Sequence, residues 1–300
     1  MPGRAQEQGT SKAVARRDDD VVGAPLGPGS VLWRVAGDGR GLLTGTAAGI
    51  MQLMHPGLGA GVIDHSEFFT DPWGRILRSI PQIWGTIFAA DDPEGDVRGK
   101  AIRDLHPHIK GTDHQGRRYH ALDPDVFWWA HATFTWEFLR AADLFFPLPL
   151  SRGEKERLYA ESITWYLRYG VSARPVPPDL AAFERRFAEI CEHELELTPA
   201  AARVLAPSPG GSTVPTKLPG PLALAEPLVG RARGELLRVT TFGCMPDVVR
   251  RRFEIPWSLA DRVQFTNLVL LMRGAGLVVP SSTFDALFPV GTPHRPPPTS

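Results

Sequence analysis

Apolar residues recur at helical spacing through most of this 300-residue chain. The strongest such run, VFWWAHATFTWEFLRAADLF, follows Asp123-Pro124. An Asp-Pro pair is typical of a helix start, because the carboxylate can accept a hydrogen bond from the first turn and proline fits the first helical position. The residues of this run that share one face are Phe127, Ala130, His131, Phe134 and Phe138. Strand patterns are few and short and no repeat occurs, so the sequence predicts a mainly α, single-domain helical fold.

The two ends of the chain depart from this pattern. Residues 1–28 are polar, charged and proline-bearing, and residues 291–300 are rich in proline, so we expect flexible or disordered tails there. The helical domain is expected over residues 29–290. It is interrupted by a long loop at 206–222, APSPGGSTVPTKLPGPL, and three further helices are expected at 222–242, 246–252 and 258–274.

Composition and missing motifs narrow the possible functions. Lysine plus arginine equals aspartate plus glutamate, at 33 each, so no cationic field points to nucleic acid. Two cysteines are too few for a disulfide framework. No apolar run has signal-peptide or membrane-spanning length, which favours a cytoplasmic protein without a transmembrane span. The chain lacks a GxSxG elbow, a P-loop and a GxGxxG turn, which argues against hydrolases, kinases and nicotinamide-dependent enzymes.

The chemistry is expected between residues 71 and 111, DPWGRILRSIPQIWGTIFAADDPEGDVRGKAIRDLHPHIKG. Arg75, Arg78 and Ser79 stand at i, i+3 and i+4, so one face of the first helix carries all three. Pro81 should kink or break that helix. A second helix, expected at 97–109, carries His106 on an apolar face. Haem needs an axial donor, an apolar slot and cationic partners, and these two helices could supply them.

Ordinary structural roles compete with this interpretation. A histidine on a helix is more often packed or solvated than metal-binding, and arginines on one face are more often solvated or salt-bridged. His106 and His108 are poorly placed to bind one metal together, because residues two apart on a helix face different ways. The residues alone leave these alternatives open.

Four stretches resemble the DUF2236 family, which includes the latex clearing protein, a rubber oxygenase, and the MpaB-type oxygenases. They are QLMHPGLGAGVIDHSEFFTDPWGRILRS at 52–79, VRGKAIRDLHPHIKG at 97–111, YHALDPDVFWWAHATF at 119–134 and MPDVVRRRFEIPWS at 245–258. The first three are similar to the family's patterns of HP, GV, HS, DP and R-L-x-R-T, then V-R-x-x-H-x-x-V-x-G with Ile109 in place of the usual valine, then Y-x-A-x-D-P with W-V-H-A-T. The fourth resembles its late P-x-x-x-R segment.

The resemblance implies a helical fold that binds haem b through one histidine, which falls on His106. It implies dioxygen bound opposite that histidine, and an apolar, unsaturated or polyisoprenoid-like substrate whose carbon–carbon double bond is cleaved. The residues it assigns to catalysis are Arg75, Arg78 and Ser79. The residues it assigns to the pocket or its surroundings are His55, His65, His131 and Thr133, with Arg75 as a cofactor contact.

The chain departs from the family pattern in three respects. Ser79 stands where the family usually has threonine, Pro107 follows the ligand directly, and the acidic base of the rubber-cleaving members has no counterpart within the aligned motifs. Two other functions remain open: a haem-binding sensor or carrier without oxygenase activity, and a cofactor-free helical interaction protein. Peripheral contact with a membrane is also compatible with an apolar substrate.

Overall fold

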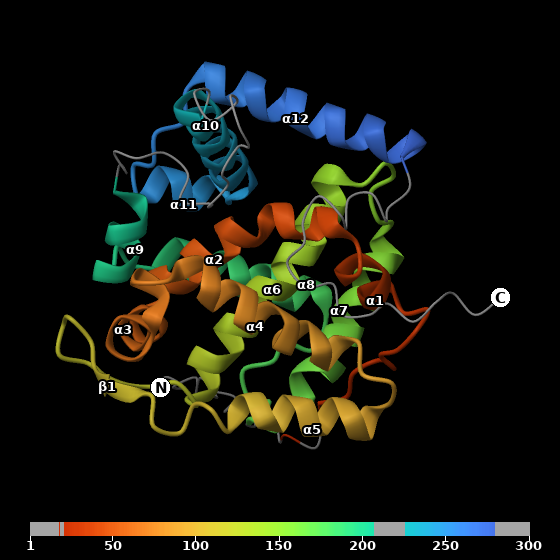
Figure 1. Ribbon diagram of the computed structural model, residues 1–300. Helices are drawn as coiled ribbons and strands as arrows, with labels where there is room; N and C mark the ends of the chain where they lie inside the picture. Colours follow the sequence, from red (N-terminus) through yellow and green to blue (C-terminus); the bar gives the residue numbers. More distant parts are fainter. Residues whose placement is uncertain (1–17, 19–20, 207–225, 280–300) are drawn as a thin grey trace, which may run out of the picture.

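Helices form nearly all of the regular structure in the computed structural model, which describes residue 18 and residues 21–206 and 226–279 (Figure 1). The predicted mainly helical fold is therefore confirmed. The first half comprises α1 Val31–Ala36, the 3-10 turn η2 Gly39–Thr44, α2 Gly45–Met54, α3 Pro56–His65, the 3-10 turn η3 Glu67–Phe69, α4 Pro72–Ile87, α5 Asp92–Arg103, β1 Lys110–Thr112 and β2 Arg118–His120. The second half comprises α6 Pro124–Phe145, α7 Arg152–Leu167, α8 Leu180–Glu189 with a π-helical turn at Ile190–Glu194, α9 Pro199–Leu205, α10 Glu226–Cys244, α11 Asp247–Arg252 and α12 Leu259–Val278.

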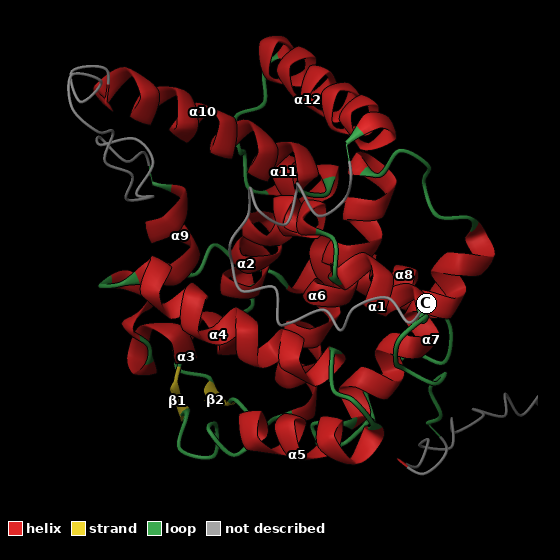
Figure 2. Ribbon diagram, turned by 45° about the vertical axis from the view of Figure 1, so that its right-hand side comes forward, coloured by secondary structure: helices red, strands yellow, loops and turns green. Residues whose placement is uncertain are grey.

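Helix α6 is the centre of the core. The Asp123 carboxylate accepts a hydrogen bond from the Asp125 amide at 2.9 Å, which confirms the helix start predicted from the Asp-Pro pair. Trp129, Phe138 and Phe145 are fully buried along it. The neighbouring helices α2, α7 and α12 and the turn η2 all pack against α6 (Figure 2). Burial of these large side chains, at about 1.5–3 kcal/mol each, is the main local reason that α6 holds its place.

Helix α4 runs unbroken across Pro81. An internal proline costs about 3 kcal/mol because it removes one hydrogen bond and crowds the preceding turn. Beyond it, Trp84 and Ile87 are buried in the core, and the Trp84 indole donates to the Ala36 carbonyl at 3.2 Å. Burial of these two side chains offsets the cost of the proline, so α4 extends past it.

Helix α5 ends at Arg103, so His106 does not lie on a helix and the helix expected to reach residue 109 was placed wrongly. A residue that precedes proline is disfavoured in the α conformation, and Pro107 imposes this on His106. The chain then forms the antiparallel hairpin β1–β2, in which Lys110 pairs with His120. Gly99 lets α5 approach the carbonyl of Arg168 at the end of α7, where a side chain would clash. This contact fixes the helix that precedes His106.

Helices α10, α11 and α12 lie together at one end of the molecule, next to α2 and α6 (Figures 1 and 2). The helices expected at 222–242, 246–252 and 258–274 are found with small shifts at Glu226–Cys244, Asp247–Arg252 and Leu259–Val278. No helix in the described ranges is long and apolar enough to cross a membrane.

The expected tails and interior loop lie largely outside the described residues. Residues 1–17, 19–20, 207–225 and 280–300 are not described. Within the stretch expected as an N-terminal tail, Val21 and Leu26 are buried, and the Ala24 amide donates to the Ala160 carbonyl of α7 at 2.8 Å.

Candidate functional site

A cavity of about 2330 Å³ lies among α2, α3, α4, α6, α10 and the segment between α5 and β1. Pockets for small molecules are typically about 300–1,000 Å³, so this one has room for a large ligand. Most of the side chains that line it are apolar, such as Ile80, Ile102 and Phe134. Gly49 of α2 also lines it, and a side-chain carbon there would meet no atom within 4 Å. The wall that α2 contributes is therefore open to the close approach of a flat ligand at this position.

His106 faces this cavity with one ring nitrogen already engaged. Its Nδ1 lies 2.8 Å from the Ile102 carbonyl oxygen, which can only accept, so Nδ1 carries the proton. Burial lowers the pKa of His106, opposed by the bond to Ile102 and assisted by the charge of Arg75. The ring is thus neutral at pH 7, with a lone pair on Nε2. This is the arrangement that histidine ligands of metals adopt, with the second nitrogen hydrogen-bonded.

Arg75 of α4 also lines the cavity, and two hydroxyls hold it. Its Nη1 donates to Ser79 Oγ at 2.8 Å and its Nε donates to Ser66 Oγ at 3.1 Å. Ser79 Oγ in turn donates to the Arg75 carbonyl at 2.8 Å. Burial, and then the charge of Arg78, lower the pKa of Arg75. In the described part of the chain it has no acidic partner, so a cation without a counter-ion stands in the cavity wall.

Arg78 points elsewhere. Its guanidinium forms ion pairs with Glu67 at 3.1 Å and Asp71 at 3.2 Å, and its side chain is 56% exposed. The cavity lining includes Arg75 and Ser79 but not Arg78. At 100° per residue, i+3 and i+4 fall on opposite sides of residue i, so the predicted face is wide. The side of this face that carries Ser79 lines the cavity, and the side that carries Arg78 lies at the protein surface.

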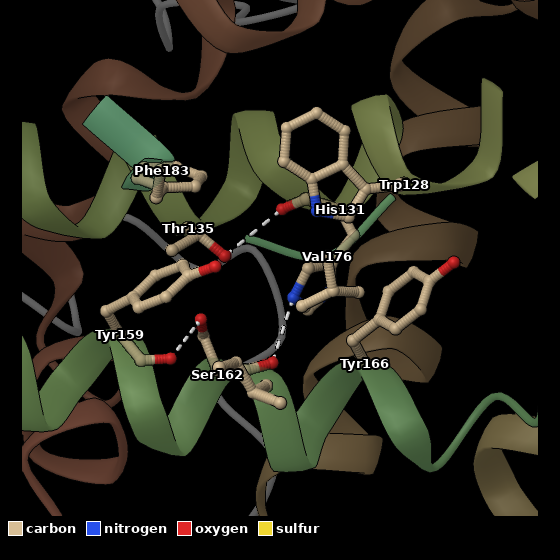
Figure 3. A pocket seen from close by; sticks show the side chains of 9 residues that line it. Trp128, His131, Thr135, Tyr159, Ser162, Tyr166, Val176 and Phe183 are labelled. Carbon is tan, nitrogen blue, oxygen red and sulfur yellow. Dashed lines mark hydrogen bonds between the residues drawn. The ribbon is translucent and has the colours of Figure 1, made fainter. Parts of the chain in front are cut away.

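His131 is enclosed between α6 and α7 (Figure 3). Its Nε2 lies 3.0 Å from the Ser162 carbonyl oxygen, and its ring lies 4.4 Å from that of Trp165. Burial lowers its pKa to about 3, opposed by the bond to Ser162. It also borders the large cavity, but its Nδ1 is buried and has no hydrogen-bond partner in the part of the chain that the structure describes. His131 is therefore a neutral wall residue.

The other predicted pocket residues fall into two groups. His55 and Thr133 are absent from the lining of the cavity. His55 stacks on Trp129, with burial lowering its pKa to about 4, and the Thr133 hydroxyl accepts a hydrogen bond from Gln52 at 2.7 Å. His65 does line the cavity at an exposed position, with Nε2 3.3 Å from the Lys110 carbonyl.

Glu137 is a cavity residue that the sequence reasoning missed. It lies on α6, one turn beyond Phe134, and is only 2% exposed. Among the described residues its carboxyl group has no hydrogen-bond or ion-pair partner, and burial raises its pKa to about 8. The signal was present in the sequence, because position 137 continues the spacing of Phe127, Ala130 and Phe134.

The Glu137 carboxyl predicts a pH-dependent stability that glutamine should remove. Its pKa is raised from 4.5 to about 8, so the unfolded chain ionises within this window while the folded chain stays protonated. The free energy of unfolding contributed by this group therefore falls as pH rises from 4.5 to 8. We expect Glu137→Gln to gain up to about 5 kcal/mol on wild type between pH 4.5 and 8.5, measured by urea unfolding. A parallel pH dependence in both proteins would contradict the assignment.

A family model described as ER-bound oxygenase mpaB/B'/Rubber oxygenase, catalytic domain, matches residues 33–274. This range includes every residue named above as bordering the cavity. No curated protein and no solved structure matches the chain.

Proposed function

The chain belongs to the family of ER-bound oxygenase mpaB/B' and rubber oxygenase catalytic domains, and from this premise we propose that it is a haem b-dependent oxygenase acting on an apolar, unsaturated substrate. The observation that carries the proposal is the state of His106. It is a neutral imidazole that lines a large apolar cavity, and its Nδ1 is bound to a backbone carbonyl while its Nε2 has no hydrogen-bond partner among the described residues.

The residues present fit haem. His106 would ligate the haem iron, and its bond to Ile102 fixes both the ring orientation and the tautomer. Phe127, whose ring lies 6.0 Å from that of His106, supplies apolar surface beside this imidazole. The volume of the cavity leaves room for a substrate next to the cofactor. Among the described residues no group of three or more His, Cys, Asp or Glu side chains is gathered as a metal site.

Bound haem b would supply an iron centre that activates dioxygen for cleavage of a carbon–carbon double bond. The chain's own residues would do three things. His106 would hold the cofactor, the apolar lining would exclude water and bind the hydrocarbon substrate, and Arg75 would stabilise negative charge that develops beside it. Ser79 would act through Arg75, because its hydroxyl holds the guanidinium at 2.8 Å.

The proposal is tested by the absorption spectrum of the purified protein and by its products. We expect a Soret band, dioxygen uptake with an isoprenoid alkene, and carbonyl products detected by mass spectrometry. A six-coordinate low-spin spectrum without oxygen uptake would instead indicate a haem sensor or carrier. Purification without a Soret band, even after haem is supplied, would contradict haem dependence.

A further inference from the structure

The cavity has a buried carboxyl group far from His106, that of Glu137. Phe127, which contacts the His106 ring, and Glu137 lie ten residues apart on α6, which is about 15 Å along the helix axis. Between them, Ala130 and Phe134 present apolar surface to the cavity. The Glu137 carboxyl is therefore too far from the His106 end to act there as a base.

The neighbours of Glu137 leave its carboxyl room and hydrogen-bonding capacity. Opposite it on α2 is Gly45, where a side-chain carbon would come within 3.1 Å of Glu137 Oε1. The next residue, Thr46, accepts a hydrogen bond from the Thr241 hydroxyl of α10 at 2.9 Å, and its own proton has no acceptor among the described residues. Gly45, Thr46, Glu137 and Thr241 all line the cavity. We call these four residues the Glu137 subsite.

This end of the cavity is chemically selective. A buried polar group without a partner destabilises the folded protein, and a ligand that forms a hydrogen bond with it removes that cost. No described cation pairs with Glu137, so the carboxyl group itself offers no positive charge to a carboxylate or phosphate. A hydroxyl or carbonyl oxygen can form a hydrogen bond with the protonated carboxyl group without carrying a charge.

We propose that the Glu137 subsite binds the neutral, oxygen-bearing end of a long apolar substrate. This inference rests on the proposed function in one respect, that the unsaturated part of the same molecule reaches the His106 end. The substrate class becomes unsaturated chains that end in an alcohol, aldehyde or ketone. Glu137 acts as a specificity-determining residue, and it takes no part in the oxidation.

The test compares ligands that differ only at one end. Oleyl alcohol, the hydrocarbon of the same chain and oleic acid are each delivered from cyclodextrin to the purified holoprotein. Affinity is measured by displacement of the neutral fluorophore N-phenyl-1-naphthylamine. Wild type is expected to bind the alcohol more tightly than the hydrocarbon or the acid. A hydrogen bond contributes about 0.5–1.5 kcal/mol, so in the Glu137→Leu variant the ratio of alcohol affinity to hydrocarbon affinity should fall by up to about tenfold. The affinity of this variant for the hydrocarbon should be unchanged.

Matched variants make the outcome decisive. Glu137→Gln keeps hydrogen-bonding capacity and should retain most of the preference, and Glu184→Leu replaces an exposed glutamate outside the cavity lining and should retain all of it. If Glu137→Leu does not fold, Gly45→Ala displaces the carboxyl while leaving it present and should reduce the preference. An unchanged ratio of alcohol to hydrocarbon affinity in Glu137→Leu, or in Gly45→Ala, would overturn the proposal.

The result separates this inference from the proposed function. The absorption spectrum of each preparation is recorded alongside the binding data. A protein that lacks haem but discriminates through Glu137 would retain the subsite and lose the oxygenase. A haem-loaded, active protein whose ligand preference does not depend on Glu137 would support the oxygenase and contradict the subsite.

Discussion

Replacement of His106 by alanine is expected to abolish the Soret band of the purified protein. The imidazole lines the cavity, and its Nδ1 is bound to the Ile102 carbonyl at 2.8 Å, which leaves Nε2 as the donor nitrogen for iron. The variant lacks the proposed ligand of the haem iron, which is the strongest expected bond between the chain and the cofactor. Haem content, measured as the ratio of Soret to protein absorbance, should fall to background, with the helical circular dichroism spectrum unchanged.

His108→Ala is the matched control for this prediction. It replaces a histidine two residues away that is exposed, lies outside the cavity lining and packs edge-on against His65 at 6.2 Å. Haem content in this variant should equal that of wild type. A normal Soret band in His106→Ala together with a reduced one in His108→Ala would move the ligand to His108. A normal band in both variants would remove the hairpin segment from consideration as the source of the ligand.

Local sequence signals predicted the helices well where each signal acts over a few residues. Asp123-Pro124 specified the start of α6, because capping requires only the first turn. The end of α5 was placed wrongly because the apolar spacing around His106 continued the helical pattern, while Pro107 opposed it. When the two signals disagree, the steric restriction before proline decides, and here it moved His106 onto a loop without removing it from the cavity.

The sequence predicted only part of the candidate site. Helical spacing places residues on a face, but it does not say how much of that face a cavity occupies. Arg75 and Ser79 line the cavity and Arg78 does not, because Glu67 and Asp71, both near the start of α4, draw Arg78 to the surface. Glu137 was missed because an acidic residue in an apolar stripe is usually interpreted as a solvated position. Its burial depends on α2 and α10, which are distant in sequence.

Arg75 and Arg78 differ in exposure and in ion pairing, so their replacement should affect catalysis differently. We expect Arg75→Met to retain haem and to lose about 100- to 1,000-fold in the rate of substrate oxidation. Methionine fills similar space, so the cavity wall is kept while its cation is removed. Arg75 has no acidic partner among the described residues, so its charge is available to whatever negative charge develops in the cavity. Oxygen uptake and product formation are measured on preparations with equal haem content.

Arg78→Met is the control, since it removes the same kind of charge from a position one turn further along the same helix. Exposed ion pairs contribute about 0–1 kcal/mol, so its loss should leave oxidation within about twofold of wild type. If Arg75→Met loses haem together with activity, Arg75 binds a propionate, and its charge is then used to hold the cofactor. If Arg78→Met proves the more damaging, the surface pairs with Glu67 and Asp71 must break when substrate or cofactor binds. Arg75 and Arg78 share a helix, a charge and a length, but Arg78 pairs with Glu67 and Asp71 while Arg75 has no acidic partner among the described residues. A difference between the two variants can therefore be assigned to the position and pairing of the charge that each one removes.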